Sequence, residues 1–66
     1  MTNKLKILRA TVDVSQQSLA DSIAVSRQTI NAMEKGKYVP STVLALKLAK
    51  FFKVPVEEIF ALEDSD

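Results

Sequence analysis

The chain has 66 residues, of which 47% are hydrophobic and 26% are charged, and its formal net charge is +1. These values predict one small globular domain, close to the size at which a single hydrophobic core is only just sufficient. The chain contains no cysteine and no histidine, which excludes disulfides, thiolate zinc sites and the most common general base of enzymes. No apolar run approaches the length of a membrane span, so we expect a cytoplasmic protein without a signal peptide.

Charge is distributed unevenly along the chain. All nine Lys and Arg residues lie within residues 1–53 beside three acidic residues, which gives this part a charge of +6. Residues 54–66 hold the other five acidic residues and no basic one, which gives −5. A basic body suits a polyanionic partner, whereas two ordinary solvated faces explain the same counts equally well.

Serine residues mark the starts of the helices predicted in the first half of the chain. A first helix is expected over residues 4–10, and a second begins after Ser15 and runs to Ile23. Ser26 is expected to cap a third helix by accepting a hydrogen bond from a backbone N–H of its first turn. Gly36 then ends this helix, since glycine is the usual left-handed residue just past a helix.

Two further helices complete an all-α fold of five helices. After a loop over residues 37–40, Ser41 caps a fourth helix. Its apolar residues repeat at helical spacing: Leu44, Ala45, Leu48, Ala49 and Phe52. Pro55 opens a short fifth helix, because proline costs little at the first helical position. We expect a single domain over residues 1–66, with its core in residues 4–60 and an acidic tail over residues 61–66.

Residues 16–34 are predicted to form two short helices around a tight turn. Six apolar residues fall where a helix-turn-helix needs inward-facing side chains: Leu19, Ala20, Ile23, Val25, Ile30 and Met33. Five other residues point outward from the second of these helices: Arg27, Gln28, Thr29, Asn31 and Ala32. Arg and Gln carry the hydrogen-bonding groups that match guanine and adenine edges in the major groove, so this stretch predicts double-stranded DNA as the partner.

The chain resembles the lambda-repressor-like (Cro/Xre-type) helix-turn-helix family of small phage and bacterial regulators. The resemblance runs from about Leu5 to Phe60. Its most specific part is SRQTINAMEKGKYVPS (residues 26–41), together with LR (residues 8–9) and SQQSLA (residues 15–20). It implies a compact five-helix DNA-binding domain that regulates transcription.

The resemblance also implies roles for individual positions. The implied base-reading residues are Arg27, Gln28, Thr29, Asn31 and Ala32. The implied phosphate-contacting residues are Gln16, Ser26, Lys35, Lys37 and Tyr38. Arg9 and Glu34 match a partly buried ion pair that joins the first helix to the third. Asp13, Ala24 and Lys53 stand where the family commonly has glycine, so left-handed backbone is expected at these three residues.

Several of these roles have a plainer alternative. Arg27 is placed to read a guanine, or to bind a phosphate if it swings outward. Tyr38 either contacts DNA or packs on its own loop. Lys35 and Lys37 either contact phosphates or only complement the helix dipole.

A homodimer is expected, because one recognition helix reads too few base pairs to find a site in a genome. The resemblance places the contact at the fifth helix, in Val56, Ile59 and Phe60. The chain ends, residues 1–3 with residues 61–63, are an alternative contact that pairs as short strands. In a third interpretation Ile59 and Phe60 belong to the core, and the protein dimerises only on DNA.

The sequence therefore predicts a sequence-specific transcriptional regulator, in the simplest case a repressor that occludes a promoter by binding a palindromic operator. No cofactor, metal ion, membrane contact or small-molecule ligand is expected. An enzyme is disfavoured because Gly36, the only glycine, cannot form a Gly-rich phosphate loop, and because Glu57 and Glu58 are neighbours that point in different directions. The remaining alternatives are an antitoxin and a protein-interaction module built on the same frame.

Overall fold

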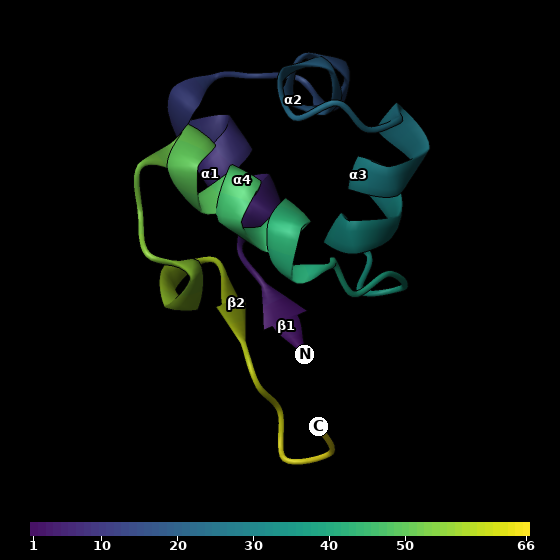
Figure 1. Ribbon diagram of the computed structural model, residues 1–66, viewed down its shortest axis with the longest axis vertical. Coiled ribbons are helices and arrows are strands. Elements are labelled where there is room, and N and C mark those ends of the chain that lie inside the picture. Colours follow the sequence, from purple (N-terminus) through teal and green to yellow (C-terminus); the bar gives the residue numbers. More distant parts are fainter.

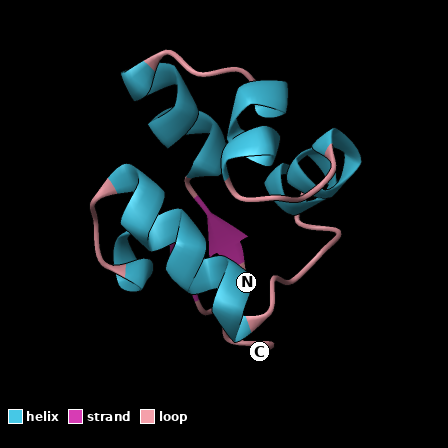
Figure 2. Cartoon of the chain, turned by 45° about the horizontal axis from the view of Figure 1, so that its top comes forward, coloured by secondary structure: helices cyan, strands magenta, loops and turns pink.

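Four α-helices and two short strands make up the structure, a computed structural model that describes residues 1–66 (Figure 1). In chain order the elements are β1 (Thr2–Asn3), α1 (Leu5–Val12), α2 (Gln16–Ser22), α3 (Arg27–Glu34), α4 (Thr42–Phe52), a 3₁₀ turn (Val56–Glu58) and β2 (Phe60–Ala61). Most of the chain is therefore helical, and the strands are confined to its two ends (Figure 2). No helix combines the length and the apolar character needed to cross a lipid bilayer.

The prediction of a fifth α-helix after Pro55 is wrong. The segment after Pro55 makes one 3₁₀ turn, in which Glu58 N–H donates to the carbonyl of Pro55 at 3.0 Å and Ile59 N–H to that of Val56 at 2.9 Å. Phe60 then enters β2 instead of continuing the helix. The segment is too short to repay the cost of starting an α-helix, while strand pairing satisfies its next backbone groups.

The all-α class is wrong for the same part of the molecule. β1 and β2 pair antiparallel, with Thr2 opposite Ala61 and Asn3 opposite Phe60. The chain ends thus form short strands, as the alternative dimer contact predicted. The two strands, however, pair with each other within one chain. Lys4 N–H extends this connection by donating to the carbonyl of Ile59 at 2.9 Å.

Serine caps begin three of the four α-helices, as predicted. The hydroxyl of Ser15 accepts from the Ser18 N–H at 3.0 Å, that of Ser26 from Thr29 at 3.1 Å, and that of Ser41 from Leu44 at 3.1 Å. Each cap satisfies one of the N–H groups that have no partner inside the helix. The starts of α2, α3 and α4 are therefore fixed by local chemistry.

All four α-helices end in the same type of turn. In each, a left-handed residue follows the helix, and the next N–H donates to the carbonyl five residues back, the Schellman pattern. The four hydrogen bonds run from Val14 to Arg9, Val25 to Ala20, Lys37 to Ala32, and Val54 to Ala49, at 2.9–3.1 Å. The left-handed residues are Asp13, Ala24, Gly36 and Lys53, with φ between 57° and 73°. The expectation of left-handed backbone at the three non-glycine residues is confirmed.

The hydrophobic core lies where the helices converge and contains only apolar residues. Its eleven members are Leu5, Leu19, Ala20, Ile23, Ile30, Met33, Leu44, Leu48, Phe52, Ile59 and Phe60. Five of the six inward-facing residues predicted for the helix-turn-helix are in this set, and the sixth, Val25, packs against it half-buried. Ala20 is completely buried, and its small side chain allows α2 and α3 to approach closely.

The left-handed turn after α2 predicts an unusual response to glycine. Ala24→Gly removes a Cβ that disfavours this conformation, but it also adds freedom to the unfolded chain. The net expectation is a gain of about 0.5 kcal/mol in the free energy of unfolding, measured by urea denaturation.

Ala20→Gly is the matched control, because it makes the same exchange inside α2 at a buried position. It should lower the free energy of unfolding by about 1 kcal/mol. A loss of stability in both variants would contradict the strain assigned to Ala24.

Candidate nucleic-acid interface

α3 has one buried and one open face. Ile30 and Met33 point into the core and are completely buried, whereas Arg27 and Gln28 are exposed at the start of the helix. Among the other predicted base-reading residues, Thr29, Asn31 and Ala32 are partly exposed along the next two turns. Because the core fixes the inner face, the helix backbone holds these five residues in a fixed order along its outer face. We call them the row on α3.

An open, polar hollow lies along this outer face. Its lining residues are Gln17, Ser26, Arg27, Gln28, Asn31, Ala32, Lys35 and Lys37. A neighbouring hollow at the start of α2 is lined by Arg9, Ser15, Gln16, Gln17 and Arg27. Neither hollow is lined by an acidic residue, while four different Arg and Lys residues line the two. The surface is therefore suited to a polyanion.

Gln17 lines both hollows, although only its neighbour Gln16 is predicted from the sequence to contact DNA. Its amide donates to the Asp21 carboxylate one turn along α2, at 2.9 Å. Its position in the first turn of α2, directly after Gln16, is the sequence feature that could have indicated that it lies on this surface. Gln17 thus lies on the same surface as the predicted base-reading residues of α3.

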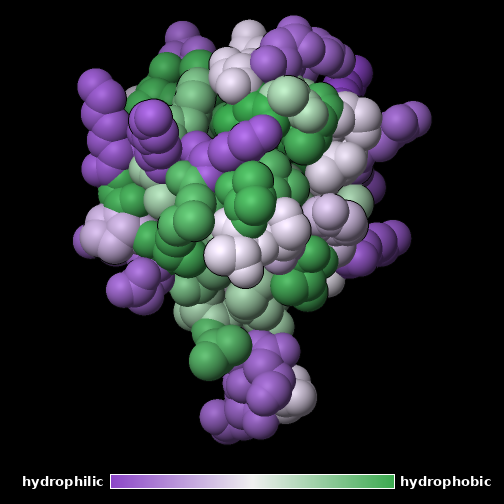
Figure 3. All heavy atoms as spheres, in the orientation of Figure 1, coloured by the Kyte–Doolittle hydropathy of each residue, from purple (hydrophilic) through white to green (hydrophobic).

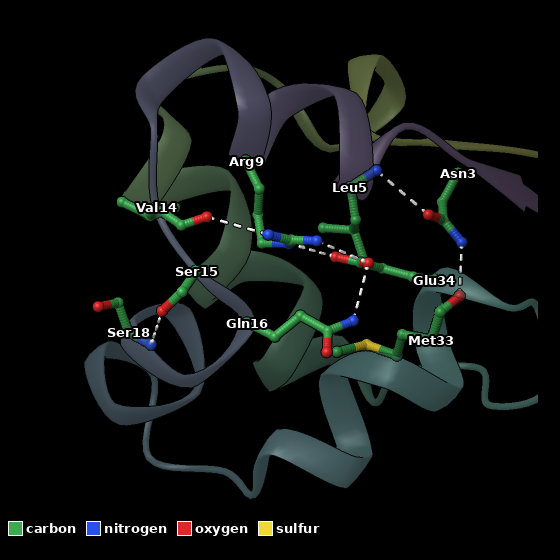
Figure 4. A network of polar contacts seen from close by, with 9 residues as sticks. All are labelled: Asn3, Leu5, Arg9, Val14, Ser15, Gln16, Ser18, Met33 and Glu34. Atoms are coloured by element: carbon green, nitrogen blue, oxygen red, sulfur yellow. Dashed lines mark hydrogen bonds and ion pairs between the residues drawn. The ribbon is translucent and has the colours of Figure 1, made fainter.

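The Glu34 carboxylate joins α1, α2 and α3 in one polar network (Figure 4). Arg9 donates to both carboxylate oxygens, from Nε to Oε2 at 2.5 Å and from Nη2 to Oε1 at 3.0 Å. The third nitrogen of the guanidinium, Nη1, donates to the Val14 carbonyl at 3.0 Å. Gln16 Nε2 also donates to Glu34 Oε1, at 3.1 Å. The geometry of the Arg9–Glu34 contact is the bidentate form, the strongest that these two groups make.

Burial and hydrogen bonding act in opposite directions on Glu34. Its side chain is only 6% exposed and that of Arg9 16%. Burial alone would raise the pKa of the Glu34 carboxyl, but hydrogen bonds from Arg9 and Gln16 and the positive charge of Arg9 outweigh it and hold the pKa below its ordinary value. Hydrogen bonding to Glu34 in turn raises the pKa of Arg9. The pair therefore stays ionised at neutral pH.

Asn3 ties the chain-end strands to the end of α3 (Figure 4). Its Nδ2 donates to the Met33 carbonyl at 2.8 Å, and its Oδ1 accepts from the Leu5 N–H at 3.2 Å. One side chain thus satisfies a terminal group of α3 and one of α1. No sequence pattern indicates this role, because the contact joins residues 30 positions apart.

A helix-turn-helix family model matches residues 5–59. The chain belongs to the Cro/Xre-type helix-turn-helix family. Its relatives include uncharacterized HTH-type transcriptional regulators of Methanocaldococcus jannaschii, 56% identical, and of Bacillus subtilis (YgzD), 48% identical, each matched over the whole of both chains. The CTXphi phage transcriptional repressor RstR of Vibrio cholerae is 38% identical over 88% of this chain and 52% of its own length. Family membership makes this protein a DNA-binding transcriptional regulator.

Within this helix-turn-helix domain, the predicted phosphate-contacting residues surround the row on α3. Lys35, Lys37 and Tyr38 are exposed after its C-terminal end, and Gln16 stands half-buried at the start of α2. The Ser26 hydroxyl is already engaged, because it caps α3 and hydrogen-bonds to Thr29 Oγ1 at 2.9 Å. A phosphate at Ser26 would therefore share that hydroxyl with the cap.

Two of the three residues predicted to form the dimer contact are buried in the hydrophobic core. Ile59 and Phe60 are buried members of the core, and Val56 alone of the three is half-exposed. A contact between two copies near the 3₁₀ turn would therefore use Val56 and its exposed neighbours rather than Ile59 and Phe60.

Removing Glu34 should destabilise the domain strongly. Glu34→Ala leaves the Arg9 guanidinium largely buried without its partner, so we expect a loss of about 3 kcal/mol or more in the free energy of unfolding. Glu57→Ala, at an exposed carboxylate without an ion-pair partner, is the control and should change stability by less than about 0.5 kcal/mol. Thermal and urea denaturation measure both, and equal small losses would contradict a structural role for the pair.

The lowered pKa of Glu34 predicts how stability depends on pH. Because Glu34 binds its proton less readily in the folded than in the unfolded chain, its contribution is complete above the unfolded pKa of about 4.3. It is lost as the pH falls through the lower folded pKa. Between pH 5 and pH 2, the wild type should therefore lose stability more steeply than Glu34→Gln in parallel urea titrations. Identical slopes would show that the Glu34 pKa is the same in both states.

Proposed function

We propose that this protein is a sequence-specific regulator that binds double-stranded DNA by inserting α3 into the major groove. In this proposal it represses transcription as a homodimer on a palindromic operator, in the cytoplasm and without cofactor or small-molecule ligand. The observation that carries the proposal is the pair Arg27 and Gln28, exposed at the start of α3 while the opposite face of the helix is locked in the core.

Gln28 is assigned the central part in base reading. Its amide has a donor and an acceptor side by side, which match N7 and N6 of one adenine in the major groove. No other base presents that combination. Arg27 is assigned a neighbouring guanine, and Thr29, Asn31 and Ala32 follow along the groove, where Ala32 offers an apolar contact to a thymine methyl group.

Phosphate contacts are assigned to the ends of the two helices. Lys35, Lys37 and Tyr38 are exposed beyond the C-terminal end of α3, and Gln16 lies at the start of α2. The Glu34 contact uses one hydrogen of the Gln16 amide, which leaves the second to donate to a phosphate oxygen. These contacts would set the orientation of α3 in the groove, whereas the row on α3 sets the sequence.

Repression is supported by the small size of the domain and by the name of one relative, the transcriptional repressor RstR. A compact DNA-binding domain acts most simply by occupying a promoter. A protein-interaction module on the same frame is the second candidate, and it would be favoured by an apolar or acidic outer face of α3. The hollow along α3 contains one hydrophobic residue and no acidic one, which favours DNA.

Two substitutions separate base reading from phosphate binding. Gln28→Ala should cost about 1–3 kcal/mol on the cognate site and little on random DNA, with relaxed preference at one base pair of each half-site. Lys37→Ala should weaken binding to all sequences and reduce the magnitude of the salt slope by about one. The site comes from selection of bound duplexes from a random pool, and affinities are then measured on every single-base variant at several salt concentrations.

The pattern of losses decides the assignment. A uniform loss across all variants for Gln28→Ala would remove Gln28 from the base-reading residues. Loss of specific binding alone for Lys37→Ala, with an unchanged salt slope, would remove Lys37 from the phosphate-contacting residues. Failure of the wild type to enrich any sequence, together with weak binding to heparin, would favour the protein-interaction module.

A further inference from the structure

The last turn of α3 is anchored from a distant part of the chain. Asn3 Nδ2 donates to the Met33 carbonyl at 2.8 Å, and no other residue far away in sequence donates to a backbone carbonyl of α3. The same carbonyl accepts from the Gly36 N–H at 3.0 Å, so both of its lone pairs are used. A backbone turn and a side chain from the chain-end strands therefore meet at one oxygen atom.

This turn carries lysines that are assigned to phosphate contact. Lys35 and Lys37 flank Gly36, and the Lys37 N–H closes the turn on the Ala32 carbonyl at 2.9 Å. Ala32 belongs to the row on α3 and directly precedes Met33 in the helix. A shift of the Met33 carbonyl would therefore move the lysines relative to the row.

Asn3 is itself held in place by the core and by α1. Its backbone pairs with that of Phe60. The next N–H, of Lys4, donates to the carbonyl of Ile59, and both Ile59 and Phe60 are buried in the core. Asn3 Oδ1 accepts from the Leu5 N–H at 3.2 Å, the hydrogen bond of an Asx turn at the start of α1. The amide is therefore presented to α3 in one orientation.

The chain-end strands lie at the margin of the molecule. Beyond β2 the chain leaves the helical body and continues as the hydrophilic tail, which Figure 3 shows below the rest of the molecule. Each strand has only two residues, and an isolated pair of strands is marginally stable at best. Contacts with the helices must therefore hold this sheet in place, and Asn3 makes such contacts with both α1 and α3.

We propose that Asn3 is a positioning residue of the DNA interface. Its amide fixes the end of α3, so that the row on α3 and the lysines beyond it meet the major groove and the phosphates at the same time. This inference rests on the proposed function, and it adds that the chain-end strands control DNA recognition through α3. When the hydrogen bond to Met33 is broken, the end of α3 occupies several positions and the binding-competent fraction falls. The apparent dissociation constant of the cognate site then rises by the same factor.

Asn3→Asp breaks this anchor and keeps the other contact of the side chain. At neutral pH an aspartate forms the Asx turn to the Leu5 N–H, but it has no hydrogen to donate and places a negative charge beside the Met33 carbonyl. Thr2→Asp is the matched control, because Thr2 is the neighbouring exposed residue of β1 and takes the same charge without a hydrogen bond to α3. Asn3→Ser serves if Asn3→Asp unfolds, because its uncharged hydroxyl can form the same turn but ends short of the amide nitrogen.

Amide hydrogen exchange of the free protein tests the anchor without DNA. The equivalent amides of the four helix-ending turns give an internal comparison: Val14, Val25, Lys37 and Val54. In Asn3→Asp, the Lys37 and Gly36 amides should exchange about 10-fold faster, while the three valine amides keep their rates. Thr2→Asp should leave all of these rates unchanged.

Affinity for the selected duplex tests the effect on recognition. Asn3→Asp should bind this site about 10-fold more weakly than Thr2→Asp does. The two variants should bind random DNA equally well, because non-specific binding depends on charge, which they share. Asn3→Ser should lose about 10-fold on the selected site relative to the wild type.

Other outcomes would overturn the inference. Unchanged exchange at Lys37 and Gly36 would show that Asn3 does not hold this turn, and faster exchange at all four turns would show that it only stabilises the whole domain. A loosened turn with the cognate affinity of Thr2→Asp would show that the chain-end strands do not control recognition, while selective binding by the wild type would leave the proposed function intact. Failure of the wild type to select any sequence would refute the proposed function and the effect on recognition together, and the exchange rates would still decide whether Asn3 holds the turn.

Discussion

The orientation of α3 depends on one carboxylate. Glu34 lies at the end of α3 and holds Arg9 of α1 and Gln16 of α2, while Arg9 in turn holds the connection between those helices through the Val14 carbonyl. A core of eleven apolar residues gives α3 a place to pack but little directional constraint. Bidentate hydrogen bonds supply that direction, because they are satisfied at one angle only. Glu34 and Arg9 thus orient the outward-facing side chains of α3 without being among the residues proposed to contact DNA.

The parts of the fold that depend on nearest neighbours in sequence were predictable. Serine caps and left-handed turns are local chemistry, and Ser26 and Ala24 behave as their positions indicate. The chain-end strands were not assigned to one chain, because two-residue strands have no periodicity and their partners stand almost sixty residues apart. The fifth helix was expected because Pro55 and the apolar spacing after it imitate a helix start. The contact between Arg9 and Glu34, 25 residues apart, came only from the family resemblance, and Asn3 had no signal at all.

The uneven charge of the sequence becomes an uneven charge in space. The acidic residues after residue 53 belong to the 3₁₀ turn and the tail, and the tail lies at the end of the long axis opposite α2 (Figure 1). Four of the basic residues, Arg9, Arg27, Lys35 and Lys37, line the two hollows at α2 and α3. A cluster of basic residues without acidic neighbours in its lining is the arrangement that favours the approach of a polyanion to that surface.

The Schellman turn that ends each of the four helices has a different closing residue after α3. After α1, α2 and α4, the residue that closes the turn is a valine: Val14, Val25 and Val54. Such a side chain folds back over its own helix and strengthens the turn. After α3 the same backbone hydrogen bond is made by Lys37, whose side chain is exposed, and the left-handed residue is Gly36, with no atom within 4 Å of where a Cβ would stand. Glycine there meets the backbone requirement alone. At this one of the four helix ends, an exposed lysine therefore stands where the other three turns have a half-buried valine, and the turn presents a positive charge where the phosphate contact of Lys37 is proposed.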